Sequence, residues 1–172
     1  MKVLGKVLVA VALVAAGLWV GGLLALGAIA APVVFKIVPP PFNADAMTVV
    51  FRRFDRVAMS AAAVILIVEV ALAVIRRPNT GRDAARAAAA VAAGALSVWQ
   101  GAALSPRIEA LHQAGAVRGQ GTLGLDLEAA HSLAELCGKS ITLLVVAVIV
   151  LHVFSVPRLS GDPFVEPSPK IK

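Results

Sequence analysis

Four long apolar stretches constrain this chain more than any other feature of its sequence. They cover residues 7–38, 57–75, 87–104 and 141–156. A helix needs about 20 residues to cross the hydrocarbon core of a bilayer. The sequence therefore predicts an all-α fold, an integral membrane four-helix bundle. Its spans are expected at about residues 6–37, 45–76, 83–104 and 127–156.

Composition supports a membrane protein without a soluble domain. Apolar residues make up 59% of the chain, charged residues make up 15%, and the mean hydropathy is +0.89; ordinary soluble domains are far less apolar. Residues 1–156 are predicted to form one four-span domain. Residues 157–172 contain four prolines and are expected to be a disordered tail. The first stretch is longer than the apolar region of a signal peptide, so a retained span is expected.

The first stretch is also too long for a straight span. Its 32 residues would measure about 48 Å as a helix, against a hydrocarbon core of about 30 Å. The span must tilt, protrude or bend, and Pro32 is the predicted bend because it lacks a backbone donor. Gly17, Gly21 and Gly22 are expected to let another helix pack closely.

The connection between the third and fourth spans is rich in proline and glycine. Ser105-Pro106 is expected to end the third span, with a short interfacial helix over residues 107–114. Glycines between residues 115 and 124 then predict a flexible connection. Asp126 is the expected cap of the fourth helix.

Two ionisable residues lie inside apolar stretches near the same end of the bundle. Glu69 is seven residues before Arg76, and this places it about 10 Å inside the membrane. His152 falls at a similar depth. Because a charge in hydrocarbon needs a partner, Glu69 is predicted to point inward, where His152 or polar atoms of a neighbouring helix satisfy it.

A second group of polar residues is predicted at the opposite end. His131, Glu135 and Lys139 are spaced four apart, so they share one face of the fourth helix, and Glu135 and Lys139 can form an ion pair. This face is expected to look into the protein. The whole candidate ligand-binding cluster comprises Arg52, Arg53, Asp55, Arg56, Gln100, His131, Glu135 and Lys139. The alternative interpretation is that its arginines contact headgroups and its charges form structural pairs.

No catalytic, metal or cofactor site is predicted. His131 and Glu135 offer two ligands on one face, but a metal site needs three or four. The sequence contains no Gly-x-Ser-x-Gly elbow and no phosphate-binding loop. Cys137 is expected to be a small buried apolar residue. The net charge of +6 comes from basic residues beside apolar stretches, a pattern that favours anionic lipid headgroups over nucleic acid.

Basic residues also predict the orientation of the chain. With four spans, one side receives Lys2, Lys6, Arg76, Arg77, Arg82, Arg86, Arg158, Lys170 and Lys172. The other side receives Lys36, Arg52, Arg53, Arg56, Arg107 and Arg118. Because lysine and arginine accumulate on the cytoplasmic side, we expect a multi-pass protein of the inner (cytoplasmic) membrane with both termini in the cytoplasm.

Several short motifs carry a family resemblance. They are Leu18-Trp19-Val20-Gly21-Gly22-Leu23, Ala31-Pro32-Val33-Val34-Phe35, Phe51-Arg52-Arg53-Phe54-Asp55, Ser105-Pro106-Arg107-Ile108 and His131-Ser132. In this order they resemble a bacterial family of four-helix membrane proteins, which is known only as a domain of unknown function and is related to a small eukaryotic transmembrane protein. The resemblance covers about residues 19–150 and implies the fold, but no activity.

The Trp-x-Gly-Gly-Leu element also looks like first-span sequences of copper-resistance-type membrane proteins. Those proteins often place a histidine in the first span, whereas this chain has none before His112. The analogy therefore concerns the fold alone.

Three functional classes remain open. The favoured class is a structural or assembly subunit of a membrane complex, with other membrane subunits or a second copy as partner. A small transporter, channel or ligand-binding membrane protein is the alternative. A metal- or haem-binding membrane redox protein is the third. Water access to Glu135 and Lys139 would favour transport over a structural role.

Overall fold

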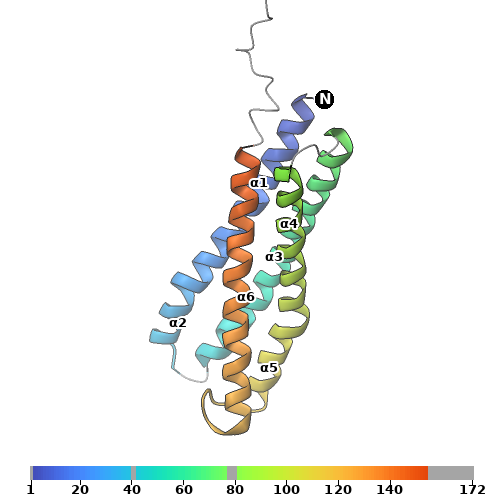
Figure 1. Ribbon diagram of the computed structural model, residues 1–172. Coiled ribbons are helices and arrows are strands. Elements are labelled where there is room, and N and C mark those ends of the chain that lie inside the picture. Colours follow the sequence, from blue (N-terminus) through green and yellow to red (C-terminus); the bar gives the residue numbers. More distant parts are fainter. Residues whose placement is uncertain (1, 40–41, 77–80, 155–172) are drawn as a thin grey trace, which may run out of the picture.

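A computed structural model shows an all-helical bundle over residues 2–39, 42–76 and 81–154 (Figure 1). The helices are α1 (Lys2–Leu24), α2 (Ala31–Ile37), α3 (Phe42–Arg76), α4 (Gly81–Trp99), α5 (Ser105–Gln113) and α6 (Gly121–Val153). Two π-helical segments, η1 (Ala25–Ala30) and η2 (Gln100–Leu104), join α1 to α2 and α4 to α5. The tail expected over residues 157–172 lies outside the described residues.

These helices form four rods that are long and apolar enough to span a membrane, as the sequence predicts. The candidate spans are Val3–Ile37, Phe42–Ile75, Gly81–Gln113 and Gly121–Val153. The chain is therefore a multi-pass membrane protein with a four-helix bundle fold. Within the bundle, α1 and α4 each contact both α3 and α6.

Both π-helical segments stand immediately before a proline in the first turn of the next helix. Pro32 follows η1 and Pro106 follows η2. A proline removes a backbone donor and crowds the preceding turn, and a wider turn relieves that crowding. Accordingly, the N–H of Ala31 donates to the carbonyl of Leu26 and the N–H of Ser105 to that of Gln100, each five residues back.

The prediction that Ser105-Pro106 ends the third span is therefore wrong. The helix continues through the π turn into α5. The expected start of the fourth helix is wrong as well, since α6 begins at Gly121 and Asp126 lies inside it. Gly124 fits this early start because a Cβ there would collide with the carbonyl oxygen of Val117.

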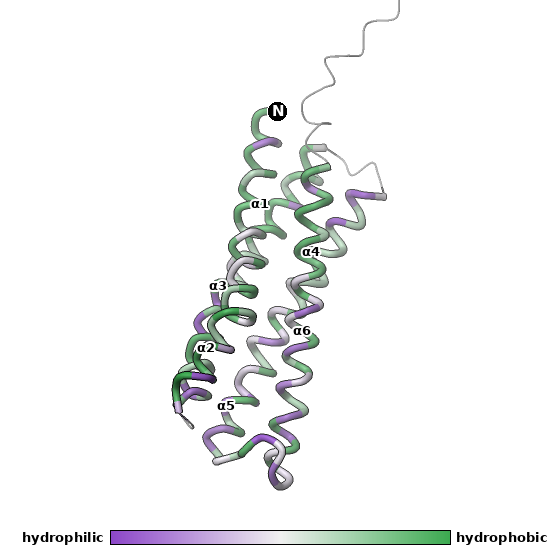
Figure 2. Tube along the Cα trace, turned by 90° about the vertical axis from the view of Figure 1, so that its left-hand side faces the viewer, coloured by the Kyte–Doolittle hydropathy of each residue, from purple (hydrophilic) through white to green (hydrophobic). Residues whose placement is uncertain are grey.

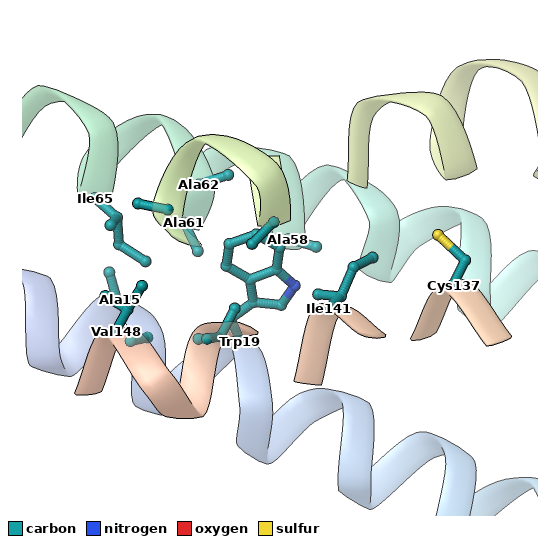
Figure 3. Packing of buried hydrophobic residues seen from close by; sticks show 13 residues of the cluster. Ala15, Trp19, Ala58, Ala61, Ala62, Ile65, Cys137, Ile141 and Val148 are labelled. Carbon is teal, nitrogen blue, oxygen red and sulfur yellow. The ribbon is translucent and has the colours of Figure 1, made fainter. Parts of the chain in front are cut away.

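The centre of the bundle consists of one large side chain surrounded by small ones. Trp19 is 1% exposed and packs within a cluster of alanines and branched residues (Figure 3). Alanines let helices approach closely. The cluster includes Ala15, Ala58, Ala61, Ala62, Ile65, Ala93, Cys137, Ile141 and Val148.

Polarity is distributed unevenly along the bundle. Figure 2 shows apolar residues over most of α1, and polar residues gathered on α5 and on the half of α6 beside it. We call the end formed by α5, the start of α3 and the first half of α6 the polar end.

Candidate functional site

A buried ion cluster lies near the end opposite the polar end. Glu69 on α3 and Arg86 on α4 are both buried. Arg86 Nε donates to Glu69 Oε1 at 2.7 Å, and Nη2 donates to Oε2 at 3.0 Å. This two-point geometry matches a guanidinium to a carboxylate and is the strongest form of the pair.

Two more side chains complete the cluster. His152 on α6 is fully buried, and its Nε2 lies 2.9 Å from Glu69 Oε1. That approach has the distance but not the geometry of a hydrogen bond, so it is a close polar contact. Asp83, one turn before Arg86, accepts a hydrogen bond from Arg86 Nη1 at 2.9 Å. The cluster therefore ties α3, α4 and α6 together.

A second buried polar group lies beside the π turn of η2. Asp55 on α3 is buried and accepts a hydrogen bond from Ser105 Oγ at 2.7 Å. A Cβ on Gly101 would lie 3.4 Å from the Asp55 Cβ, so the wide turn packs directly against the aspartate. One position earlier on α3, the Phe54 ring fills the space where a Cβ of Gly22 would stand. Phe54 and Asp55 thus connect α3 to spans one and three at neighbouring positions.

The remaining residues of the predicted polar cluster do not converge. Arg52 pairs with Glu109 on α5 at 2.6 Å, and Arg53 and Arg56 are exposed. The ring of His131 contacts that of His112 on α5 edge-on, with centroids 5.6 Å apart. The Gln100 side chain is half-buried, and its Oε1 has no hydrogen-bond partner among the described residues.

The predicted inward orientation of Glu135 and Lys139 is wrong. Their ion pair forms at 2.7 Å, but the two side chains are 66% and 69% exposed. The buried face of α6 includes Cys137 and Ile141. Residues 135 and 139 each lie two positions from one of these, or about 200° around the helix, so they face outward.

The glycines of the first span behave differently from one another. Gly22 lies in close contact with Phe54, whereas a Cβ on Gly17 or Gly21 would meet no atom within 4 Å. Within one chain, the expected helix packing is therefore wrong for Gly17 and Gly21. The spacing alone did not say which side of the helix faces α3.

Glu69 and His152 do lie together, as the sequence predicts, but the residue that hydrogen-bonds to Glu69 is Arg86. From the sequence, Arg86 was counted only among the basic residues on the side of the bundle that carries the termini. The depth of Arg86 in the membrane could have identified it as the partner. Arg86 is five residues into α4, and Glu69 is seven residues before Arg76, so the two lie at similar depths. Ser105 and Glu109 were also missed, since their pairing depends on the helix continuing past Pro106.

A metal centre finds little support in this geometry. Among the described residues, no three His, Cys, Asp or Glu side chains are placed to hold one ion together. Glu135 is engaged with Lys139 on the outer surface.

Comparison with known families identifies the chain's relatives. A family model described as "Domain of unknown function (DUF4149)" matches residues 14–116. The chain belongs to this family. The DUF4149 match includes Glu69, Arg86, Asp55 and Ser105 and ends before α6 begins. No curated protein and no solved structure matched the chain.

Proposed function

We propose that this DUF4149 protein is a structural or assembly subunit of a membrane protein complex and that it works through its outer surface. The supporting observation is the apolar block that separates the two buried polar groups. Asp55 and Glu69 are 14 residues apart on α3, or about 21 Å. Between them the inward face carries Ala58, Ala61, Ala62, Ile65 and Val68, all buried.

A transport route through the bundle would need polar groups or water along this length. The block instead places Trp19 at its centre. Each polar group is satisfied locally, Glu69 by Arg86 and Asp55 by Ser105. Polar pairs that are hydrogen-bonded locally and far from each other suit a rigid scaffold better than a transport route.

The outer face of α6 is the surface proposed to meet the partner. It presents the Glu135–Lys139 pair beside Leu136, which is itself highly exposed. Charged and apolar groups side by side suit a protein surface that can pair with the charges and cover the leucine. The excess of basic residues at the other end supports an orientation with both termini in the cytoplasm.

A ligand-binding membrane protein is the second candidate. Trp19 Nε1 is a buried donor and Gln100 Oε1 a buried acceptor, and neither has a hydrogen-bond partner in the described part of the chain. Buried polar atoms without partners are uncommon and call for an explanation, such as a bound molecule.

Site-specific photo-cross-linking in native membranes tests the first proposal. A cross-linking amino acid replaces Leu136 on α6 or, as a control of similar exposure, Val70 on α3. The Leu136 position should give one protein adduct at fixed stoichiometry, and the control should not. Reversing both charges, Glu135→Lys with Lys139→Glu, should abolish the adduct without lowering thermal stability. Equal labelling at both sites, or an adduct unaffected by charge reversal, would contradict the proposal.

A further inference from the structure

The first rod is longer than a bilayer is thick, and its excess length is apolar. The span Val3–Ile37 contains 35 residues, or about 52 Å of helix against a core of about 30 Å. Lys36 is the one charge between residues 7 and 38. About 15 residues must therefore extend beyond the core or enter lipid at an angle.

The third rod provides an internal comparison, because it has the same order of helical segments. Both α2 and α5 follow a π-helical segment and carry proline in their first turn. The α5 continuation contains Arg107, Glu109 and His112, as expected for a helix that enters water. Counted from the prolines, the corresponding positions of the first rod are Val33, Phe35 and Val38. The same order of segments with opposite side-chain polarity indicates different surroundings.

The helices α2 and α5 also differ in how they pack against the rest of the bundle. The α5 helix contacts both α3 and α6, whereas the main contact of α2 outside its own rod is with α3. Figure 1 shows α2 diverging from α6 at the polar end, while α5 stays beside α6. The η1 and α2 segments contain no buried residue, and Ile29, Val33, Phe35 and Ile37 are 50–72% exposed.

A helix that is apolar around its whole circumference is stable in lipid or under a protein cover, and not in water. Here the single basic residue is in the last turn of α2, where Lys36 is exposed. A terminal lysine can extend its ammonium to anionic headgroups while its methylenes remain in apolar surroundings. This arrangement matches the boundary between acyl chains and headgroups.

We propose that the η1–α2 edge of the bundle is immersed in the headgroup–acyl boundary, while the α5 edge at the same end emerges into water. The bundle then sits asymmetrically in the bilayer. Both rods contain a π-helical segment followed by a proline, and the polarity of the side chains beyond it decides which edge enters lipid. This inference is independent of the proposed role as a subunit.

Nitroxide labels on exposed positions of α2 and α5 test the immersion. Cys137 is buried, with its Sγ 3.7 Å from the Leu96 carbonyl, so Cys137→Ser preserves both size and donor. In that background, Val33→Cys labels α2 and Ala110→Cys labels an exposed site on α5. The full chain is reconstituted in vesicles of phosphatidylcholine and phosphatidylglycerol at three to one. Collisions with oxygen and with a water-soluble nickel(II) chelate are then measured.

The label at Val33 should collide mainly with oxygen, and the label at Ala110 mainly with nickel. A nickel-accessible Val33 would place α2 in water, and a Val33 shielded from both reagents would place it under protein; either result overturns the proposal. A benzoylphenylalanine at Phe35 gives an independent readout that leaves Cys137 in place. It should form adducts with phospholipid, and adducts with protein would overturn the proposal.

Discussion

Replacing Arg86 with methionine should destabilise the bundle strongly, because it removes one partner of a buried ion pair. The Glu69 carboxylate would keep its burial and lose two hydrogen bonds, of 2.7 and 3.0 Å. Breaking a buried pair from one side costs about 3–5 kcal/mol. His152, 2.9 Å away, still faces Glu69, so we expect the lower end, about 3 kcal/mol. For a chain of this size that corresponds to a fall in Tm of roughly 6–12 °C.

The measurement is thermal unfolding in detergent, followed by circular dichroism. Glu69→Gln should also destabilise, and the double variant Glu69→Gln/Arg86→Met should be more stable than the sum of the single losses predicts. Lys139→Met is the matched control, because it breaks an ion pair of the same 2.7 Å length on the exposed surface; its Tm should not change measurably. If Arg86→Met behaved like Lys139→Met, or if the losses were strictly additive, Glu69 and Arg86 would not form a stabilising buried pair.

Two further predictions use the same unfolding assay. Gly22→Ala should destabilise by about 1–3 kcal/mol through overpacking against Phe54. Gly21→Ala, whose Cβ would meet no atom within 4 Å, should not destabilise, because alanine is the better helix former; equal effects would show that the contact is absent. Ser105→Ala should cost about 1–3 kcal/mol, because buried Asp55 loses its 2.7 Å hydrogen bond, and no loss would mean that Asp55 finds another donor.

The sequence predicted the number of spans and the fold class because a bilayer requires long apolar helices whatever their neighbours are. It also predicted that Glu69 needs a partner, since a carboxylate at that depth cannot stay unpaired. It did not identify Arg86 as the main partner. That choice depends on how far α4 is shifted along α3, and apolar runs do not specify such a shift.

The outward position of Glu135 and Lys139 was also beyond the sequence. Spacing by four shows that two residues share a helical face, but not which face packs inward. The buried face of α6 is set by small and branched residues such as Cys137, Ile141 and Val145. Likewise, a proline in the sequence can mark either a bend in a helix or its end. Here the π turn before Pro106 allows the helix to continue into α5.

The proposed scaffold requires a bundle that is sealed around Trp19, and tryptophan fluorescence measures whether water reaches this side chain. The chain has two tryptophans, and Trp99 is partly exposed. A Trp99→Phe variant therefore reports Trp19 alone in the full-length protein in lipid vesicles. We predict a blue-shifted emission that neither iodide nor acrylamide quenches, because no water reaches the centre of the bundle. A red-shifted emission of Trp19 that these reagents quench would contradict a sealed bundle and would favour an aqueous path through the helices.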